Sequence, residues 1–246
     1  MSAFVDYKKY LRGNSRKRLK ELAIFEIGGF GSSPYPIFDF LSERNAKKVI
    51  YRGINPDSYE YLWDRSMSLK EWQRTFSQRM IQNHSSLKEG IDKLVIPWDG
   101  MNIPYPFTEN SFDEFHCHML DSPIISLTSD YLATPERFVD EVNRLLRLEG
   151  RVYLTIQNNL FFRTGNRPAY IKESVAMMDQ MISRLQTHHF TIDRLDYGSG
   201  SNSNIETYLQ QQNYTFPVER VNYSSLRTFT RESTVDLLLI ATKMLV

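Results

Sequence analysis

Seven short apolar runs separated by helical patterns constrain the fold of this chain more than any other feature. Each run has the length of a β-strand, and together they cover residues 22–27, 48–54, 94–98, 112–117, 151–157, 190–195 and 235–242. Between them, apolar residues recur at helical spacing in 36–45, 69–87, 135–148 and 170–185. Strands that alternate with helices favour parallel pairing, because each helix carries the chain back to the edge where the next strand begins. The pattern therefore predicts an α/β fold with a doubly wound, mainly parallel sheet.

Length and charge limit the kinds of protein that this chain can be. A chain of 246 residues can bury one core, so we expect a single domain over residues 1–246. Its net charge of +1 argues against binding nucleic acid or anionic lipid over the whole surface. The single cysteine, Cys117, excludes an internal disulfide, and no apolar stretch approaches the roughly 20 residues that a membrane helix needs. We expect a soluble, cytoplasmic protein with no membrane partner.

A glycine-rich segment follows the first predicted strand. The strand ends at Glu26-Ile27, and Gly28, Gly29 and Gly31 come directly afterwards. Glycines at such a position permit a tight turn and let a ligand approach the backbone closely, as in nucleotide-binding α/β proteins. The alternative interpretation is a turn that serves packing alone.

Further segments resemble the class I S-adenosylmethionine-dependent methyltransferases. The most specific is residues 102–113, whose Ile103-Pro104-Tyr105-Pro106-Phe107 and Ser111-Phe112-Asp113 are similar to the family's passage into the fourth strand. Residues 138–152 resemble the helix, glycine turn and strand that follow, with Gly150 closing the helix. The resemblance implies a seven-stranded Rossmann-like sheet with an antiparallel last strand. Within these segments we expect Asp113 to order backbone groups, and Glu141 to pair with Arg144 on one helix face.

The resemblance also implies a cofactor, S-adenosylmethionine, with S-adenosylhomocysteine as its product. Asn55 stands where the family has an acidic residue that binds the ribose, and Asp99 stands where the family often has an aspartate beside the adenine amino group; the resemblance implies Met101 as a wall of the adenine site. Phe30 and Ser32 occupy positions where the family has glycines, so the first loop departs from the pattern. The predicted cofactor-binding residues are Glu26, Gly28, Gly29, Gly31, Asn55, Asp99, Gly100 and Met101.

His116, Cys117 and His118 end the fourth predicted strand, where the transferable methyl group is expected. A histidine with a near-neutral pKa can accept a proton from a hydroxyl acceptor, so His116 and His118 are the predicted catalytic residues. The alternative is a buried histidine and an ordinary hydrogen-bonding one. A metal site is not predicted, because adjacent residues of a strand point to opposite faces and no other ligand cluster accompanies the three.

Two segments lie outside the predicted core pattern. Residues 1–20 form a basic lead that could contact RNA or phosphate, although such runs are more often solvated. Residues 198–216 are rich in Gly, Ser, Asn and Gln and predict a surface insertion or lid.

The favoured function is methyl transfer to a small-molecule acceptor. The alternatives are a binding or regulatory subunit with weakened cofactor binding, and an RNA or protein methyltransferase. The oligomeric state is not predicted.

Overall fold

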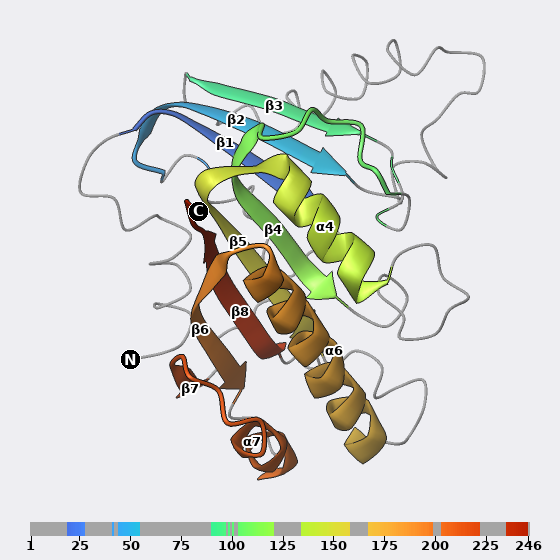
Figure 1. The fold of residues 1–246 in the computed structure, drawn as a ribbon. Helices are drawn as coiled ribbons and strands as arrows, with labels where there is room; N and C mark the ends of the chain where they lie inside the picture. The colour runs from blue at the N-terminus through green and yellow to red at the C-terminus, as the bar shows by residue number, and fades with distance from the viewer. Residues whose placement is uncertain are drawn as a thin grey trace, which may run out of the picture.

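A computed structural model describes the fold of residues 19–27, 41, 44–54, 90–96, 98, 100, 103–120, 134–157, 167–198, 203–221 and 235–245. Within these residues the chain forms one sheet, and two long helices lie against it (Figure 1). The strands are β1 (Leu19–Ile27), β2 (Ala46–Ile54), β3 (Ile91–Ile96), β4 (Phe112–Leu120), β5 (Leu146–Gln157), β6 (Phe190–Gly198), β7 (Val218–Val221) and β8 (Val235–Lys243). The helices are α4 (Pro135–Leu145), α6 (Arg167–Thr187) and α7 (Ser203–Gln210).

The strand order confirms the predicted fold class and corrects the number of strands. The order is β3-β2-β1-β4-β5-β8-β6-β7. The last strand, β8, is antiparallel to both of its neighbours, and the other adjacent pairs are parallel. The sheet has eight strands among the described residues rather than the predicted seven. The additional strand, β7, is only four residues long, which is too short for its alternation to stand out in the sequence.

Residues 198–216, predicted as an insertion or lid, contain regular structure in the part that is described. They include α7, which packs against α6, and the chain then enters β7 parallel to β6. This part of the segment therefore contains a helix that leads into the edge strand β7, which begins just beyond it at Val218, and the polar, Gln-rich composition conceals this helix.

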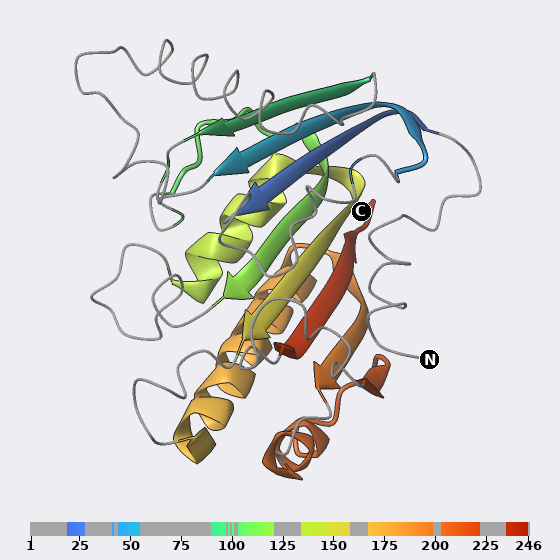
Figure 2. The same cartoon turned by 180° about the vertical axis from the view of Figure 1, so that it is seen from behind.

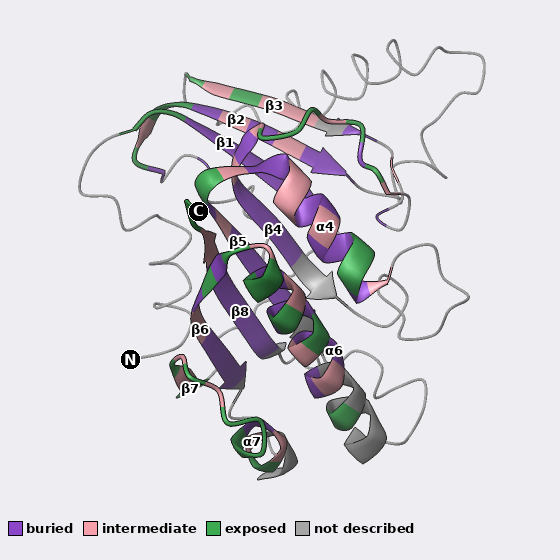
Figure 3. Ribbon diagram, in the orientation of Figure 1, coloured by how far each residue is buried: buried purple, intermediate pink, exposed green. Residues whose placement is uncertain are grey.

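Both faces of the central strands are covered. All residues from Leu22 to Ile27 of β1 are buried, and Figure 3 shows burial concentrated in β1, β4, β5 and β8. Continuous burial is typical of a strand with a layer on each face. Helices α4 and α6 lie on one face, in front of the sheet in Figure 1 and behind it in Figure 2. The helices expected on the way from β1 to β3, at 36–45 and 69–87, fall almost wholly outside the described residues.

Phe25 of β1 is the centre of an aromatic cluster between the sheet and α4. Its ring centroid lies 5.2–5.4 Å from those of four rings, and one of these, Phe115, packs edge-on against Phe138 of α4 at 5.7 Å. Such tilted and edge-to-face pairs add to the free energy gained by burial. The other three rings belong to Tyr105, Phe107 and Phe112. The cluster therefore fixes the 105–112 segment against the centre of the sheet.

Helix α4 begins as predicted and ends earlier than predicted. Thr134 caps its start by accepting a hydrogen bond from the Arg137 N–H at 3.3 Å, and Pro135 follows in the first turn. The helix ends at Leu145 rather than 148, because Leu146 is already extended and pairs with Phe112 of β4. The Asn110 and Ser111 N–H groups bind the carbonyls of Arg144 and Leu145. These two hydrogen bonds satisfy carbonyl groups at the end of the helix, so Gly150 is not needed to close it.

Gly150 is needed for close packing, and its replacement gives a testable loss of stability. A Cβ there would lie 2.8 Å from the Arg147 carbonyl oxygen and 3.3 Å from that of Asp113. We expect Gly150→Ala to lower the free energy of unfolding by about 1–3 kcal/mol, because backbone must shift to admit the methyl group. Urea denaturation checks this, with the exposed Leu148→Ala as the control expected to change it by less than about 0.5 kcal/mol. Equal effects of the two variants would contradict the packing argument.

Asp140 joins α4 to α6 and gives a prediction for pH dependence. Its carboxylate accepts hydrogen bonds from Arg184 at 2.7 and 2.9 Å and contacts the His188 Nε2 atom at 2.6 Å. The Arg184 hydrogen bonds, aided by His188, hold the pKa of Asp140 below its ordinary value. A lowered pKa in the folded state stabilises the fold above the unfolded value of about 3.9, and this contribution disappears as the pH falls through the folded pKa.

We expect Asp140→Asn to lower the free energy of unfolding at pH 7 by no more than about 1 kcal/mol, because the side chain is 43% exposed and solvent screens the pair. Near pH 2–3 the difference between the variant and the wild type should shrink, since the wild type has then lost the same contribution. Denaturation curves at the two pH values test this. A deficit that stays constant between them would exclude the ion pair as its cause.

Candidate ligand-binding end of the sheet

The strand order reverses between β1 and β4, and this is where an open α/β sheet binds ligands. From β1 the chain moves outward through β2 to β3, and it then returns to β4 on the other side of β1. At the carboxyl ends of these two neighbours, Ile27 pairs with Cys117 and Glu26 with His116. Helices on the two sides diverge at such a point and leave a crevice beyond the strand ends. Two predicted site residues, Glu26 and His116, are thus brought together here.

Gly100, which follows β3, lies against the end of β1. A Cβ at Gly100 would stand 3.1 Å from Cγ2 of Ile27. The Gly100 carbonyl accepts a 2.7 Å hydrogen bond from the Tyr105 hydroxyl, which holds the turn in place. The structure therefore places Gly100, one residue of the predicted adenine segment, beside the end of β1.

Two charged residues of α4 hold the segment that carries Tyr105. Glu141 is buried and accepts the Tyr105 N–H at 2.7 Å, and it also pairs with Arg144 at 2.5 Å. Arg144 in turn donates to the carbonyls of Tyr105 at 3.0 Å and Phe107 at 2.8 Å. The predicted Glu141–Arg144 pair is confirmed, and it is part of a clamp, defined by these two residues, that fixes the chain between β3 and β4. The hydrogen bonds that Arg144 donates to Glu141 are the largest cause of the raised pKa of Arg144.

Asp113 has the ordering role predicted for it. Its Oδ2 atom accepts the Ala23 N–H of β1 at 2.7 Å, and Arg147 approaches its Oδ1 atom at 3.1 Å. The carboxylate thus ties the start of β4 to β1 and to the beginning of β5. This role is structural, because Asp113 lies at the opposite end of β4 from the switch point.

Glu26 and His116 are both fully buried. Glu26 accepts a 2.5 Å hydrogen bond from the Tyr51 hydroxyl of β2. The His116 Nε2 atom lies 2.9 Å from the Glu114 carboxylate, and the imidazole stacks on Tyr153 with ring centroids 4.4 Å apart and an interplanar angle of 7°. These contacts fix both side chains at the switch point.

Glu114 also forms an ion pair with Arg44, which lies just before β2. The side chains are 2% and 9% exposed. Burial is the main cause that lowers the pKa of Arg44 to about 10; Tyr153 opposes it and Arg151 adds a smaller lowering, so the guanidinium remains charged at neutral pH. Arg44, Glu114 and His116 thus form a buried charged network under the switch point.

The sequence did not identify Tyr51, Glu114, Arg44 or Tyr153 as partners of the site. The available signal was the charged or polar residue at every second position of β4, a buried strand.

The remaining predicted site residues divide into three groups. Cys117 is buried in the apolar core, on the opposite face from His116. His118 lies in β4, where its backbone pairs with Thr155, and nothing is described of its side chain. Outside the described residues are Gly28, Gly29, Gly31, Asn55, Asp99 and Met101. Among the residues that are described, no group of three or more His, Cys, Asp or Glu side chains could hold a metal ion, and no helix is long and apolar enough to span a membrane.

Comparison with known proteins finds similarity in structure alone. No family model and no curated protein matches the sequence. A geranyl diphosphate C-methyltransferase from Streptomyces coelicolor, solved with S-adenosyl-L-homocysteine, is 8% identical with a TM-score of 0.46, covering 98% of this chain and 81% of that one. The [4+2]-cyclase SpnF is 13% identical with a TM-score of 0.47, covering 99% and 82%. YcgJ from Bacillus subtilis is 15% identical with a TM-score of 0.44, covering 94% and 95%. Because these TM-scores lie below 0.5, the fold class rests on the strand order of the chain itself.

Proposed function

We propose that this protein transfers a methyl group from S-adenosylmethionine to a small-molecule acceptor at the β1–β4 switch point. The observation that carries the proposal is the contact of Gly100 with Ile27 at the carboxyl ends of the strands. Ile27 immediately precedes one of the two segments in which the sequence resembles the cofactor site of class I methyltransferases, and Gly100 belongs to the other. The ligand position follows from the topology, and the identity of the cofactor follows from the resemblance.

The described residues fit a nucleotide cofactor at this place. Gly100 is buried at a point where a Cβ would press on Ile27, and the Tyr105 hydroxyl fixes its backbone. The Glu26 carboxylate is held near the end of β1 by its hydrogen bond from the Tyr51 hydroxyl. In the proposed site, Asp99 binds the adenine amino group beside Met101, Asn55 binds the ribose, and the backbone of Gly28, Gly29 and Gly31 borders the rest of the cofactor.

When bound, S-adenosylmethionine would supply an activated methyl group: the acceptor's lone pair would bond to the methyl carbon as the C–S bond breaks, and the bonding electrons would stay on the sulfur of S-adenosylhomocysteine. The protein's own contribution is to hold the acceptor in line and to take up its proton where one is released. We propose His118 as that general base, because it lies nearer the carboxyl end of β4 than His116. His116, enclosed by Glu114 and Tyr153, would support this end of the strand.

Calorimetric titration with S-adenosylmethionine and S-adenosylhomocysteine tests the proposal. The wild type is expected to bind both at micromolar concentration, and Asp99→Ala and Gly100→Val are each expected to weaken binding by at least about tenfold. Asp92→Ala is the matched control, because Asp92 lies on β3 in an exposed pair with Arg52 and should leave affinity unchanged. His118→Ala should slow methyl transfer but preserve cofactor affinity.

Absence of binding to either compound at millimolar concentration would overturn the enzyme proposal and favour a binding or regulatory subunit. Methylation of RNA or protein is a further outcome, and it would require transfer to a macromolecule that depends on the basic residues of 1–20. Transfer to small acceptors that persists after these residues are neutralised would support the proposal as stated.

A further inference from the structure

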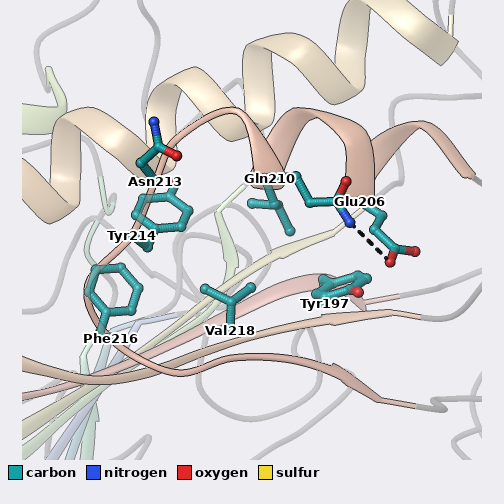
Figure 4. Close-up of a pocket in the computed structure, with 8 residues that line it drawn as sticks. Tyr197, Glu206, Gln210, Asn213, Tyr214, Phe216 and Val218 are labelled. Atoms are coloured by element: carbon teal, nitrogen blue, oxygen red, sulfur yellow. Dashed lines mark hydrogen bonds between the residues drawn. The ribbon is translucent and has the colours of Figure 1, made fainter.

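A cavity of about 320 Å³ lies between α7 and the edge of the sheet formed by β6 and β7. It is lined by Tyr197 of β6, by Glu206 and Gln210 of α7, by Tyr214 and Phe216 of the following loop, and by Val218 of β7 (Figure 4). The volume falls at the small end of the range for ligand sites. Tyr197 stands one residue before the end of β6, which is parallel to β1 and β4, so the cavity lies at the same end of the sheet as the switch point.

Aromatic rings occupy two sides of this cavity. In Figure 4, Tyr214 and Phe216 stand together at one end, and Tyr197 lies at the other, across Val218. Tyr214 and Phe216 stack with ring centroids 4.8 Å apart, and the Tyr214 hydroxyl donates to Asp179 of α6. These contacts fix the two rings before any ligand arrives, which limits the entropy lost on binding.

A carboxylate faces the same space. Glu206 of α7 lies above the ring of Tyr197 in Figure 4, and burial together with this carboxylate raises the pKa of the Tyr197 hydroxyl. Three groups approach Glu206: the Tyr197 hydroxyl donates a hydrogen bond to it, Gln210 donates at 3.4 Å, and Arg220 of β7 lies 3.9 Å away. The hydroxyl and the amide carry no charge, and the Arg220 interaction is long and 58% exposed. Arg220 therefore compensates the negative charge of Glu206 only weakly.

We propose that this cavity binds a small organic cation of the substituted-ammonium class. Ring faces attract a quaternary or alkylated ammonium, whose methyl groups also bury apolar surface, and the single carboxylate supplies the opposite charge. A neutral ligand of the same shape gains the apolar contact alone. The site is distinct from the switch point, and binding there does not depend on methyl transfer.

Choline and its uncharged carbon isostere, 3,3-dimethyl-1-butanol, test this by calorimetry or ligand-observed NMR on the full chain without S-adenosylmethionine. Choline is expected to bind at millimolar concentration or tighter, and the isostere at least about fivefold more weakly. Glu206→Gln should weaken choline binding about fivefold or more, and it should reduce the difference in affinity between choline and the isostere. Arg220→Gln should strengthen choline binding, because it removes the competing cation.

The matched control is Glu219→Gln, which removes one negative charge from the same strand edge. Glu219 contacts Arg194 at 3.4 Å and does not line the cavity, so choline affinity should change by less than about twofold. Phe216→Leu keeps an apolar side chain but removes an aromatic ring, so it should weaken the binding of choline more than the binding of the isostere. Equal binding of choline and its isostere, equal effects of Glu206→Gln and Glu219→Gln, or no choline binding at about 20 mM would each overturn the proposal.

Discussion

Replacing Arg44 by methionine is expected to lower the free energy of unfolding by about 3–5 kcal/mol. The arginine is 2% exposed and its partner Glu114 is 9% exposed, so the variant leaves a carboxylate in a nearly dry site. His116, at 2.9 Å from Glu114, offers only partial compensation. The destabilisation arises from the charge that remains rather than from the attraction that is lost. Urea denaturation monitored by circular dichroism measures it.

Two further variants separate this cause from a simple loss of packing. Adding Glu114→Gln to Arg44→Met removes the stranded charge and is expected to recover at least about half of the loss. Arg52→Met removes the corresponding arginine from the exposed pair with Asp92 and should cost no more than about 1 kcal/mol. If Arg44→Met proves as mild as Arg52→Met, the buried network does not stabilise the sheet as described.

Glu141→Ala is expected to lower the free energy of unfolding by about 2–4 kcal/mol. The substitution leaves the buried Tyr105 N–H without its 2.7 Å acceptor, and it also removes the partner that orients Arg144 toward the Tyr105 and Phe107 carbonyls. Because Tyr105 holds Gly100, the same change should weaken cofactor binding. Thermal or urea unfolding gives the first quantity, and calorimetry gives the second.

The control for Glu141→Ala is Glu136→Ala on the same helix. Glu136 is exposed in the first turn, where its charge interacts with the helix dipole and, through solvent, with Arg184, so a loss below about 1 kcal/mol is expected. Glu141→Gln keeps an acceptor for the Tyr105 N–H, so its loss in free energy of unfolding should lie between those of Glu136→Ala and Glu141→Ala. Indistinguishable results for Glu136→Ala and Glu141→Ala would show that the clamp on Tyr105 contributes nothing.

The central strands were predictable because burial on both faces makes them continuous apolar runs, as in residues 22–27 and 235–242. The end of α4 was not, since Leu146 and Leu148 continue an apolar pattern although Leu146 already pairs with β4. Helix α7 and β7 are short and polar, so neither leaves a periodic signal. Their place on the sheet edge depends on packing against α6 and β6.

The candidate site was predictable only in part. Local motifs marked Glu26, Gly100 and His116, and the strand order brings the ends of β1 and β4 together as expected of a mainly parallel sheet. The partners of these residues could not be read from the sequence, because Tyr51, Glu114 and Arg44 meet them across strands that are distant along the chain. Long-range polar contacts have no sequence period, so they appear only with the tertiary structure.

Hydrogen–deuterium exchange with and without S-adenosylhomocysteine tests the central claim most directly, because it reports both binding and its place. The proposed function predicts slower exchange in peptides that cover residues 26–31, 98–105 and 116–120, with little change at the amino ends of the strands. No change at saturating ligand, or protection confined to residues 203–221, would contradict a cofactor site at the β1–β4 switch point.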